Sequence, residues 1–392
     1  MGSVDSVANV ALALSLLLVA GRLGASAARR LGQPAVLGEL LVGIALGNLP
    51  AIGVPQLTQV LNNGGVTLLA QLGAMLLLFE VGVEQRLSEM RRLGIRAAAV
   101  AACGVTASFV VGWLVTRLIL PAAPPMVRMF LAASLTATSV GIGAGVLRDL
   151  VRVDTDEARL IIGAAVIDDV MALAVLSAAS AALGAAASPR RLMAHLGGAL
   201  VFLVCAVTVG SWIGPRIVNA ASRLRAVGAQ LGVALGICFA LSWAASAVGL
   251  AAIVGAFAAG LVLEPDKTLL GELRPITSLL APLFFISTGL HTDLTTFARP
   301  GVLLLAGGLT LAAVIGKMAC AFAVGRGVDR WAVALGMVPR GEVQLVYATL
   351  GTGLLLNGTP VVGTETYAAI VAVVLVTTLV APPLLRIRLL KE

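Results

Sequence analysis

The stretch LIIGAAVIDDVMALAVLSAASAALGA, residues 160–185, decides the fold because it places two adjacent carboxylates inside a long apolar run. A run of this length and composition predicts a helix that crosses a hydrocarbon layer of about 30 Å. An acidic side chain at the centre of such a helix costs roughly 2.5–3.5 kcal/mol, so two in succession indicate a functional site. Successive helical residues point about 100° apart. We therefore expect one of Asp168 and Asp169 to face a protein partner, and the other to face a cavity that admits a cation or a proton.

The composition of the chain predicts a polytopic helical membrane protein. Of 392 residues, 59% are hydrophobic and 12% charged, and the mean hydropathy is +1.03. These values exclude an ordinary soluble domain and a disordered chain. The four cysteines lie in apolar segments without CxxC spacing, so we expect packing residues, with no disulfide and no metal site.

Thirteen apolar segments are separated by polar breaks. Nineteen of the 27 Lys and Arg residues follow odd-numbered segments and only five follow even-numbered ones. This alternation predicts an amino terminus outside and a carboxyl terminus in the cytoplasm. Because the positive charges follow this pattern, the net charge of +8 does not indicate binding of nucleic acid. No cleavable signal and no soluble domain are evident, so we expect any regulatory module to be a separate chain. The segments are 5–28, 34–50, 65–84, 97–116, 129–147, 160–185, 195–215, 229–248, 250–264, 275–290, 300–324, 331–353 and 364–385.

Two pairs of stretches indicate an internal repeat. VLGELLVGIAL at 36–46 matches IVGAFAAGLVL at 253–263, and LLLFEVGVEQRL at 76–87 matches LFFISTGLHTDL at 283–294. Each copy has six spans and returns the chain to the side on which it began. The single linker span then starts the second copy from the opposite side, so the second copy is inverted relative to the first. Inverted repeats are common in secondary transporters, whose site lies between broken helices near the midplane. We therefore expect one transporter unit over 1–392, made of a first repeat at 1–185, a linker helix at 186–228 and a second repeat at 229–392.

The fifth segment of each copy contains a candidate broken helix. TATSVGIG at 136–143 can unwind around a small cation, or it can remain a helix whose hydroxyls bond to carbonyls four residues earlier. In the second copy, Pro339-Arg340-Gly341-Glu342 breaks the helix, because proline removes a backbone donor. Arg340 and Glu342 would neutralise charge locally or cap opposing half-helix ends. The alternative, a loop that ends the span at Met337, leaves two spans too short to cross.

Two further charged residues lie within apolar segments. Lys317 is too deep to reach the interface and needs a carboxylate, for which Asp168 or Asp169 is the natural candidate, with Glu342 or a water-filled cleft as alternatives. Glu80 lies near the broken region or forms a structural ion pair with an arginine, and we favour the ion pair.

The remaining sequence contains no nucleophile constellation, metal cluster or phosphate-binding loop, which argues against an enzyme and against ATP drive. We expect no cofactor. The available oxygen ligands suit sodium, lithium or potassium better than a transition metal. The two histidines, His195 and His291, are expected near the membrane surfaces.

The motifs together resemble those of the monovalent cation:proton antiporter-2 family, and most closely its short bacterial sodium/proton antiporters with thirteen spans. The resemblance covers nearly the whole chain in family order and is carried by ATSVGI at 137–142, GAAVIDDV at 163–170, PLFFISTGL at 282–290, IGK at 315–317 and MVPRGE at 337–342.

The resemblance implies a homodimer, with a core domain that carries crossed broken helices and a dimerisation domain that includes segments one and eight. It also implies that Asp169 binds the ion, that Asp168 pairs with Lys317 in the ion-free state, and that Thr138 and Ser139 line the site. Glu80 departs from the family pattern, in which we expect an apolar residue at that position.

These observations predict an electrogenic sodium/proton antiporter of the bacterial inner membrane that works by alternating access. Asp169 and the Asp168–Lys317 pair would permit two protons per cation. Potassium/proton exchange is the alternative within this class. A gated cation channel and a sodium-coupled organic solute carrier are alternatives from other classes. An intramembrane aspartyl enzyme is disfavoured, because the two carboxylates are adjacent on one helix.

Overall fold

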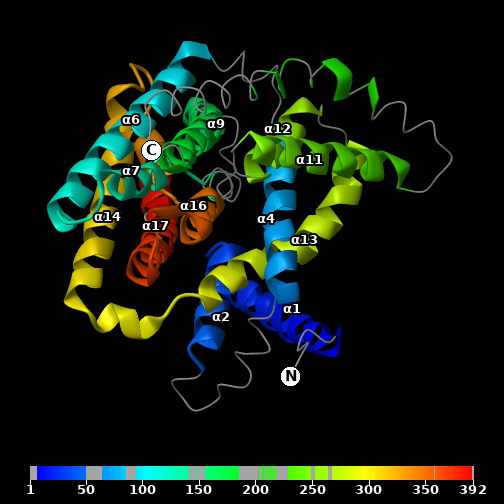
Figure 1. Cartoon of the computed structure of the whole chain (residues 1–392). Helices are drawn as coiled ribbons and strands as arrows, with labels where there is room; N and C mark the ends of the chain where they lie inside the picture. The colour runs from blue at the N-terminus through cyan, green and yellow to red at the C-terminus, as the bar shows by residue number, and fades with distance from the viewer. Residues whose placement is uncertain are drawn as a thin grey trace.

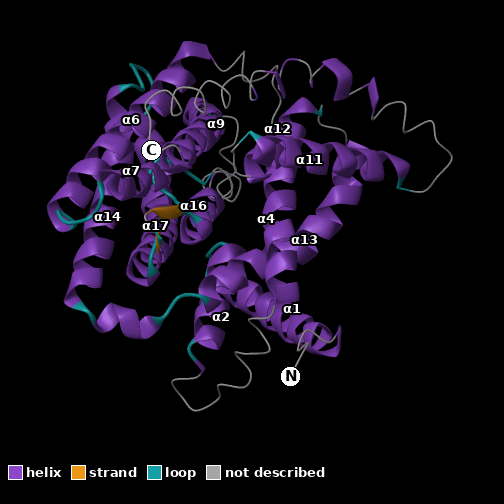
Figure 2. Cartoon of the chain, in the orientation of Figure 1, coloured by secondary structure: helices purple, strands orange, loops and turns teal. Residues whose placement is uncertain are grey.

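The described residues form α-helices and one short β-hairpin in the computed structural model (Figures 1 and 2). The structure describes residues 7–49, 64–84, 94–139, 142, 147, 155–184, 202, 205, 206, 208, 210, 212–214, 216, 217, 228–248, 252–263, 267–356 and 358–390. The elements of this described part are α1 Val7–Arg30, α2 Ala35–Gly47, α4 Gly64–Glu84, α6 Gly94–Ile119, α7 Pro125–Ser134, α9 Asp156–Gly184, α11 Ala229–Ala247, α12 Ala252–Val262, α13 Lys267–Leu290, η2 Leu294–Ala298, α14 Pro300–Met318, η3 Ala319–Phe322, α15 Arg330–Gly336, α16 Glu342–Gly353, β1 Leu355–Leu356, β2 Thr359–Pro360 and α17 Thr364–Leu390.

The predicted apolar segments correspond to these helices, although not one to one. Segment 331–353 forms two helices, α15 and α16, and segment 195–215 falls mostly outside the described residues. Within the described part, seven helices are long and apolar enough to cross a membrane, and α2 and α12 are shorter apolar helices. The described part contains thirteen α-helices, several of which are short or are halves of an interrupted segment.

One predicted helix start is wrong by two turns. The segment expected at 275–290 belongs to α13, which begins at Lys267. The missed turns carry Lys267, Glu272 and Arg274, so their polarity hides them from a search for apolar residues. A helix can continue through polar residues wherever its backbone bonds persist, and α13 begins two turns before its apolar stretch.

The helices form two bundles that lie side by side in Figure 1. We call α6, α7, α9 and α14–α17 the core bundle, and α1, α2, α4 and α11–α13 the scaffold bundle; within each, neighbouring helices pack along their lengths. A central hydrophobic cluster joins the two bundles, since it contains Phe257 and Phe284 from the scaffold bundle and Tyr347 and Ile370 from the core bundle. The bundles therefore share an extended apolar contact surface.

Glycines permit the closest helix contacts in the scaffold bundle. A Cβ on Gly289 of α13 would lie 2.4 Å from the carbonyl oxygen of Leu40 on α2, and a Cβ on Gly260 of α12 would lie 2.3 Å from that of Phe79 on α4. Neither distance is possible for a real side chain. Small residues at such positions let backbones approach where lipid supplies no hydrophobic drive between helices.

Candidate functional site at the crossed helix breaks

The first helix break follows α7, which ends at Ser134 well before the end of the predicted segment 129–147. Residues 135–139 are not helical. The hydroxyl of Ser134 donates to the carbonyl oxygen of Leu131 at 2.7 Å, and that of Thr136 donates to Ala133 at 2.8 Å. Side-chain hydroxyls thus add hydrogen bonds to carbonyl groups of the last turn, and the Ala133 carbonyl also accepts the backbone N–H of Thr136. Of the two alternatives for this stretch, the described residues adopt the interrupted one.

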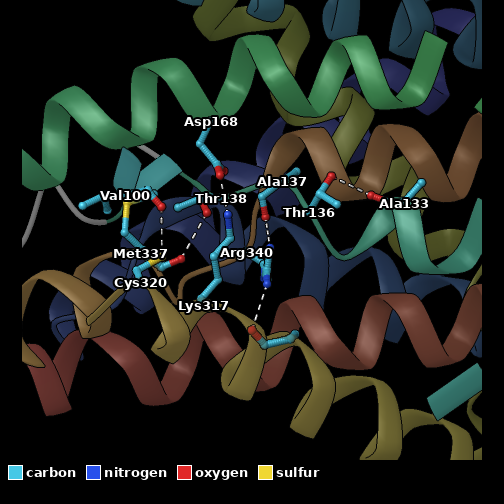
Figure 3. Close-up of polar contacts among 11 residues, drawn as sticks. Val100, Ala133, Thr136, Ala137, Thr138, Asp168, Lys317, Cys320, Met337 and Arg340 are labelled. Carbon is cyan, nitrogen blue, oxygen red and sulfur yellow. Dashed lines mark hydrogen bonds and ion pairs between the residues drawn. The ribbon is translucent and has the colours of Figure 1, made fainter. Parts of the chain in front are cut away.

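The second break lies between α15, which ends at Gly336, and α16, which begins at Glu342. The predicted interruption at Pro339 is confirmed. The two breaks bind each other: the backbone N–H of Ser139 donates to the carbonyl oxygen of Pro339 at 2.9 Å, and the Thr138 hydroxyl donates to that of Met337 at 3.1 Å (Figure 3). Non-helical backbone inside a membrane is tolerated only when other parts of the protein satisfy its polar groups. Here each break supplies partners for the other.

Arg340 fixes this crossing from the second break. Its side chain is fully buried, and its guanidinium donates to the carbonyl oxygens of Ala137, in the first break, and of Ala313, in α14 (Figure 3). Its own carbonyl oxygen accepts a 2.7 Å hydrogen bond from the Thr378 hydroxyl of α17. Arg340 therefore binds carbonyl groups at the unwound backbone. Of the two roles predicted for it, local charge neutralisation and capping, this contact corresponds to capping. The side chain of Glu342 lies outside the described residues.

Asp168 of α9 forms an ion pair with Lys317 of α14. Asp168 Oδ1 lies 2.5 Å from Lys317 Nζ, and both side chains are fully buried (Figure 3). The sequence left open which aspartate meets this lysine, and the contact is with Asp168. Burying two charges costs several kcal/mol per ion, which a close ion pair offsets. Removing either partner would leave the other as an uncompensated buried charge.

Asp169 points about 100° away from Asp168 on the same helix and is 2% exposed. That one of the two aspartates faces a cavity stays a prediction. A cavity of about 900 Å³ separates the bundles near the end of α13 and the start of α17, and its lining residues include His291, Tyr367 and Val346. Neither aspartate is among its described lining residues. On α16 this lining begins at Val346, so the first turn of α16 stands between the cavity and the breaks.

Glu80 forms the predicted structural ion pair. Its carboxylate lies 3.6 Å from Arg274 on α13, and Glu84, one turn further along α4, lies 2.7 Å from the same guanidinium. His291 is exposed at the end of α13, and His195 lies outside the described residues.

Three polar residues near the breaks escaped the sequence analysis. Thr378 holds the Arg340 carbonyl, the Tyr347 hydroxyl donates to the carbonyl oxygen of Ala172 on α9 at 2.7 Å, and Gln344 is fully buried on α16. Isolated neutral polar residues in an apolar segment give a weak signal. Gln344 and Tyr347 follow Pro339-Arg340-Gly341 within two turns, and this closeness to the predicted break could have marked them as candidates.

Comparisons with known proteins agree over nearly the whole chain. The family model described as "Sodium/hydrogen exchanger, transmembrane" matches residues 13–391. The high-affinity Na⁺/H⁺ antiporter NhaS3 of Synechocystis is 33% identical over 97% of this chain and 90% of its own. The Na⁺/H⁺-K⁺ antiporter GerN of Bacillus cereus is 34% identical over 95% and 94%, respectively. The solved structure of the sodium proton antiporter MjNhaP1 from Methanocaldococcus jannaschii matches with a TM-score of 0.73 at 18% identity, covering 98% of this chain and 100% of that one.

Proposed function

Because the chain belongs to the transmembrane sodium/hydrogen exchanger family, we propose that it is a secondary active antiporter that exchanges sodium for protons. The observation that carries this proposal is the pair of buried acids, Asp168 and Asp169, on the helix that meets the crossed breaks. The names of its relatives NhaS3 and GerN support the same exchange. A transporter of this kind needs no cofactor, and sodium, or lithium in its place, is the cargo.

Asp169 is the shared site in this mechanism. A carboxylate can hold a proton or a hard monovalent cation, but not both, so the two compete for its oxygens. Thr138 and Ser139 line the site from the first break. In the structure the Thr138 hydroxyl donates to Met337, which leaves its oxygen free to accept a cation as a ligand. The Asp168–Lys317 pair is the second titrating element, because a cation that draws Asp168 away leaves Lys317 able to release its proton.

Two protons for each sodium ion make the exchange electrogenic. The charge moved in one cycle is then one positive charge, whose transfer is worth about 2.3 kcal/mol per 100 mV. Purified protein in vesicles tests this directly. We expect sodium-driven proton flux that rises or falls with an imposed membrane potential; flux that ignores the potential would establish electroneutral exchange.

Alternating access requires the two bundles to move against each other. On α16 the cavity between the bundles ends at Val346, one turn after the second break, and both aspartates are buried. Such an arrangement suits a site that is reached from one side at a time. The positive-inside pattern places the end of α13 and the start of α17 outside, so the cavity belongs to the external route.

The glycine contacts support the inverted repeats. In the sequence matches, Gly43 corresponds to Gly260 and Gly82 to Gly289. A Cβ on Gly289 would meet the Cα of Gly43 at 2.8 Å, and one on Gly260 would meet that of Gly82 at 2.8 Å. Equivalent positions thus make equivalent contacts, α2 with α13 and α12 with α4. This correspondence favours a first repeat over 1–185 and a second over 229–392.

The same proposal includes a homodimer in the bacterial inner membrane. In the most apolar stretches of α1 and α11 only 22% of residues are buried, against 33–61% in the other five spanning helices. These are the helices assigned to dimerisation by the family resemblance. Their exposed residues include Leu16, Val19, Phe239 and Trp243. A cysteine in the middle of α1 is expected to cross-link two copies in native membranes, and failure at every exposed α1 position would contradict this interface.

Potassium is the second candidate cargo, and the name of GerN favours it. Replacing sodium by lithium or potassium in the same vesicles separates these cases. A channel would give currents far above carrier turnover, and a sodium-coupled solute carrier would move a solute and no proton. Sodium-dependent proton flux at carrier rates is the expected result; its absence from wild-type vesicles would overturn the proposed function.

A further inference from the structure

Gln344 is a buried amide that the mechanism above does not use. Its side chain is fully buried on α16, and neither Oε1 nor Nε2 has a hydrogen-bond partner among the residues that the structure describes. A buried amide without partners is costly inside a membrane, where water cannot supply the missing bonds.

Gln344 lies on a stripe of α16 that faces the first break and α9. Residues three apart on a helix share a face, so Gly341, Gln344 and Tyr347 form this stripe. At one end, a Cβ on Gly341 would lie 2.7 Å from the Ser139 hydroxyl oxygen. At the other, the Tyr347 hydroxyl donates to the carbonyl oxygen of Ala172. Gln344 therefore lies on this stripe between the contact with Ser139 and the contact with α9.

Asp169 lies at the height of Gln344. Asp168 is at the level of the breaks, because it binds Lys317, four residues after the Ala313 carbonyl that receives the Arg340 guanidinium (Figure 3). Ala172 is at the level of Tyr347. The two helices thus run in the same direction past each other. Gln344 precedes Tyr347 by three residues, and Asp169 precedes Ala172 by three residues. Because both helices rise about 1.5 Å per residue, equal steps from the Tyr347–Ala172 contact bring Gln344 and Asp169 to the same level.

We infer that the Gln344 amide oxygen is a ligand of the transported cation, opposite Asp169, and that it helps to determine which cation is accepted. This inference rests on the proposed function. Hard cations take carbonyl oxygens of Gln side chains as well as carboxylates. A neutral ligand adds coordination without adding charge, so it leaves the balance of charge to Asp169 and Lys317. When Asp169 is protonated, the same oxygen accepts its O–H, so the amide oxygen has a partner in both loaded states.

Apparent sodium affinity in vesicles tests this role. Gln344→Leu keeps the volume and removes the oxygen, and we expect the KM for sodium to rise at least about tenfold, which corresponds to 1.4 kcal/mol. The KM for lithium should change by a different factor, since ions of different size depend differently on one ligand. Gln344→Glu keeps an oxygen at this position and adds a charge. It should retain sodium transport, with its pH profile shifted.

Gln33→Leu is the matched control, because the Gln33 side-chain oxygen is also buried without a partner among the described residues but lies between α1 and α2. We expect its sodium KM to remain within twofold of wild type. A Gln344→Leu protein with wild-type KM for both ions would overturn the inference. If that variant does not fold, Gln344→Glu decides: an unchanged pH profile and an unchanged ratio of sodium to lithium KM overturn it. Absence of sodium-dependent proton flux in the wild type would instead contradict the proposed function. An active wild type and an inactive Asp169→Ala variant would support that function, so the Gln344 variants would then test the ligand role alone.

Discussion

The backbone N–H of Ser139 donates a 2.9 Å hydrogen bond to the carbonyl oxygen of Pro339, 200 residues further along the chain. Neither residue is helical, so this bond joins the two breaks at their unwound backbones. The bond and the Arg340 guanidinium together satisfy polar groups that a membrane would otherwise leave bare. The crossing is therefore held from both sides by hydrogen bonds, and Asp168 pairs with Lys317 on the helix whose Ala313 carbonyl binds Arg340.

The Asp168–Lys317 pair should contribute to stability only as a pair. Lys317→Met or Asp168→Asn leaves one buried group without its partner, and we expect a loss of about 3–5 kcal/mol in the free energy of unfolding. The double variant should recover most of this loss. Unfolding in detergent micelles measures all four proteins as a double-mutant cycle. Additive losses would show that the two side chains do not interact.

An exposed pair provides the control for this cycle. Arg299 and Glu365 form an ion pair with side chains that are 69% and 54% exposed. Because solvent screens such a pair, Glu365→Gln should cost no more than about 1 kcal/mol. A cost equal to that of Asp168→Asn would mean that burial does not account for the difference.

Gly289 and Gly260 should respond alike to a methyl group. Gly289→Ala and Gly260→Ala each place a Cβ within 2.4 Å of a backbone oxygen, and overpacking of this kind costs about 1–3 kcal/mol. Gly271, also in α13, has open space around its Cβ position. Gly271→Ala should therefore be neutral or stabilising by up to about 1 kcal/mol. Thermal unfolding in detergent compares the three, and a marked difference between Gly289→Ala and Gly260→Ala would weigh against the repeat.

Asp329, which lies outside the spanning segments, should contribute to the free energy of unfolding in a way that depends on pH. Its carboxylate accepts from the Trp331 N–H and pairs with both Nε and Nη2 of Arg388, which lowers its pKa below the ordinary 3.8. A lowered pKa means that this stability is fully present above pH 3.8 and is lost as the pH falls through the folded value. Asp329→Asn keeps the helix cap but loses the pair, so it should cost about 1 kcal/mol at neutral pH. The deficit should shrink below pH 3.8; a constant deficit would contradict the pairing.

Tyr367 forms a hydrogen bond that alternating access should break. Its hydroxyl, on α17 in the core bundle, donates to the Thr288 carbonyl oxygen on α13 in the scaffold bundle at 3.0 Å. Such a bond contributes about 1 kcal/mol, so Tyr367→Phe should raise turnover by up to about fivefold if bundle separation limits the rate. Thr377→Val removes a bond within α17 and should leave turnover unchanged. Equal effects of the two substitutions on vesicle flux would contradict relative motion at this contact.

The sequence predicted the features that local chemistry decides. Pro339 within an apolar segment required a break, and Lys317 at depth required a carboxylate. It could not decide between unwinding and back-bonding at Thr136–Ser139, because hydroxyls serve both. The choice depends on partners about 200 residues away, Met337 and Pro339, which complete the unwound form.

The rotation of α9 was also undetermined by residue spacing. Adjacent aspartates differ by about 100°, but nothing local states which of them faces α14. The family resemblance assigned Asp168, and the contact with Lys317 agrees. Residue spacing also says nothing of the cavity between the bundles, because its lining comes from both of them, Phe284 on α13 and Val346 on α16 among it.

Competition between sodium and protons at Asp169 is the central claim, and the sodium KM measured in vesicles across a range of pH tests it most directly. Wild-type protein should show a sodium KM that rises in proportion to proton concentration at acidic pH, with little change in maximal rate. Asp169→Asn should show no sodium-dependent proton flux while retaining the wild-type fold in detergent. A sodium KM independent of pH in the wild type, or sodium-driven proton flux that persists in Asp169→Asn, would contradict the account.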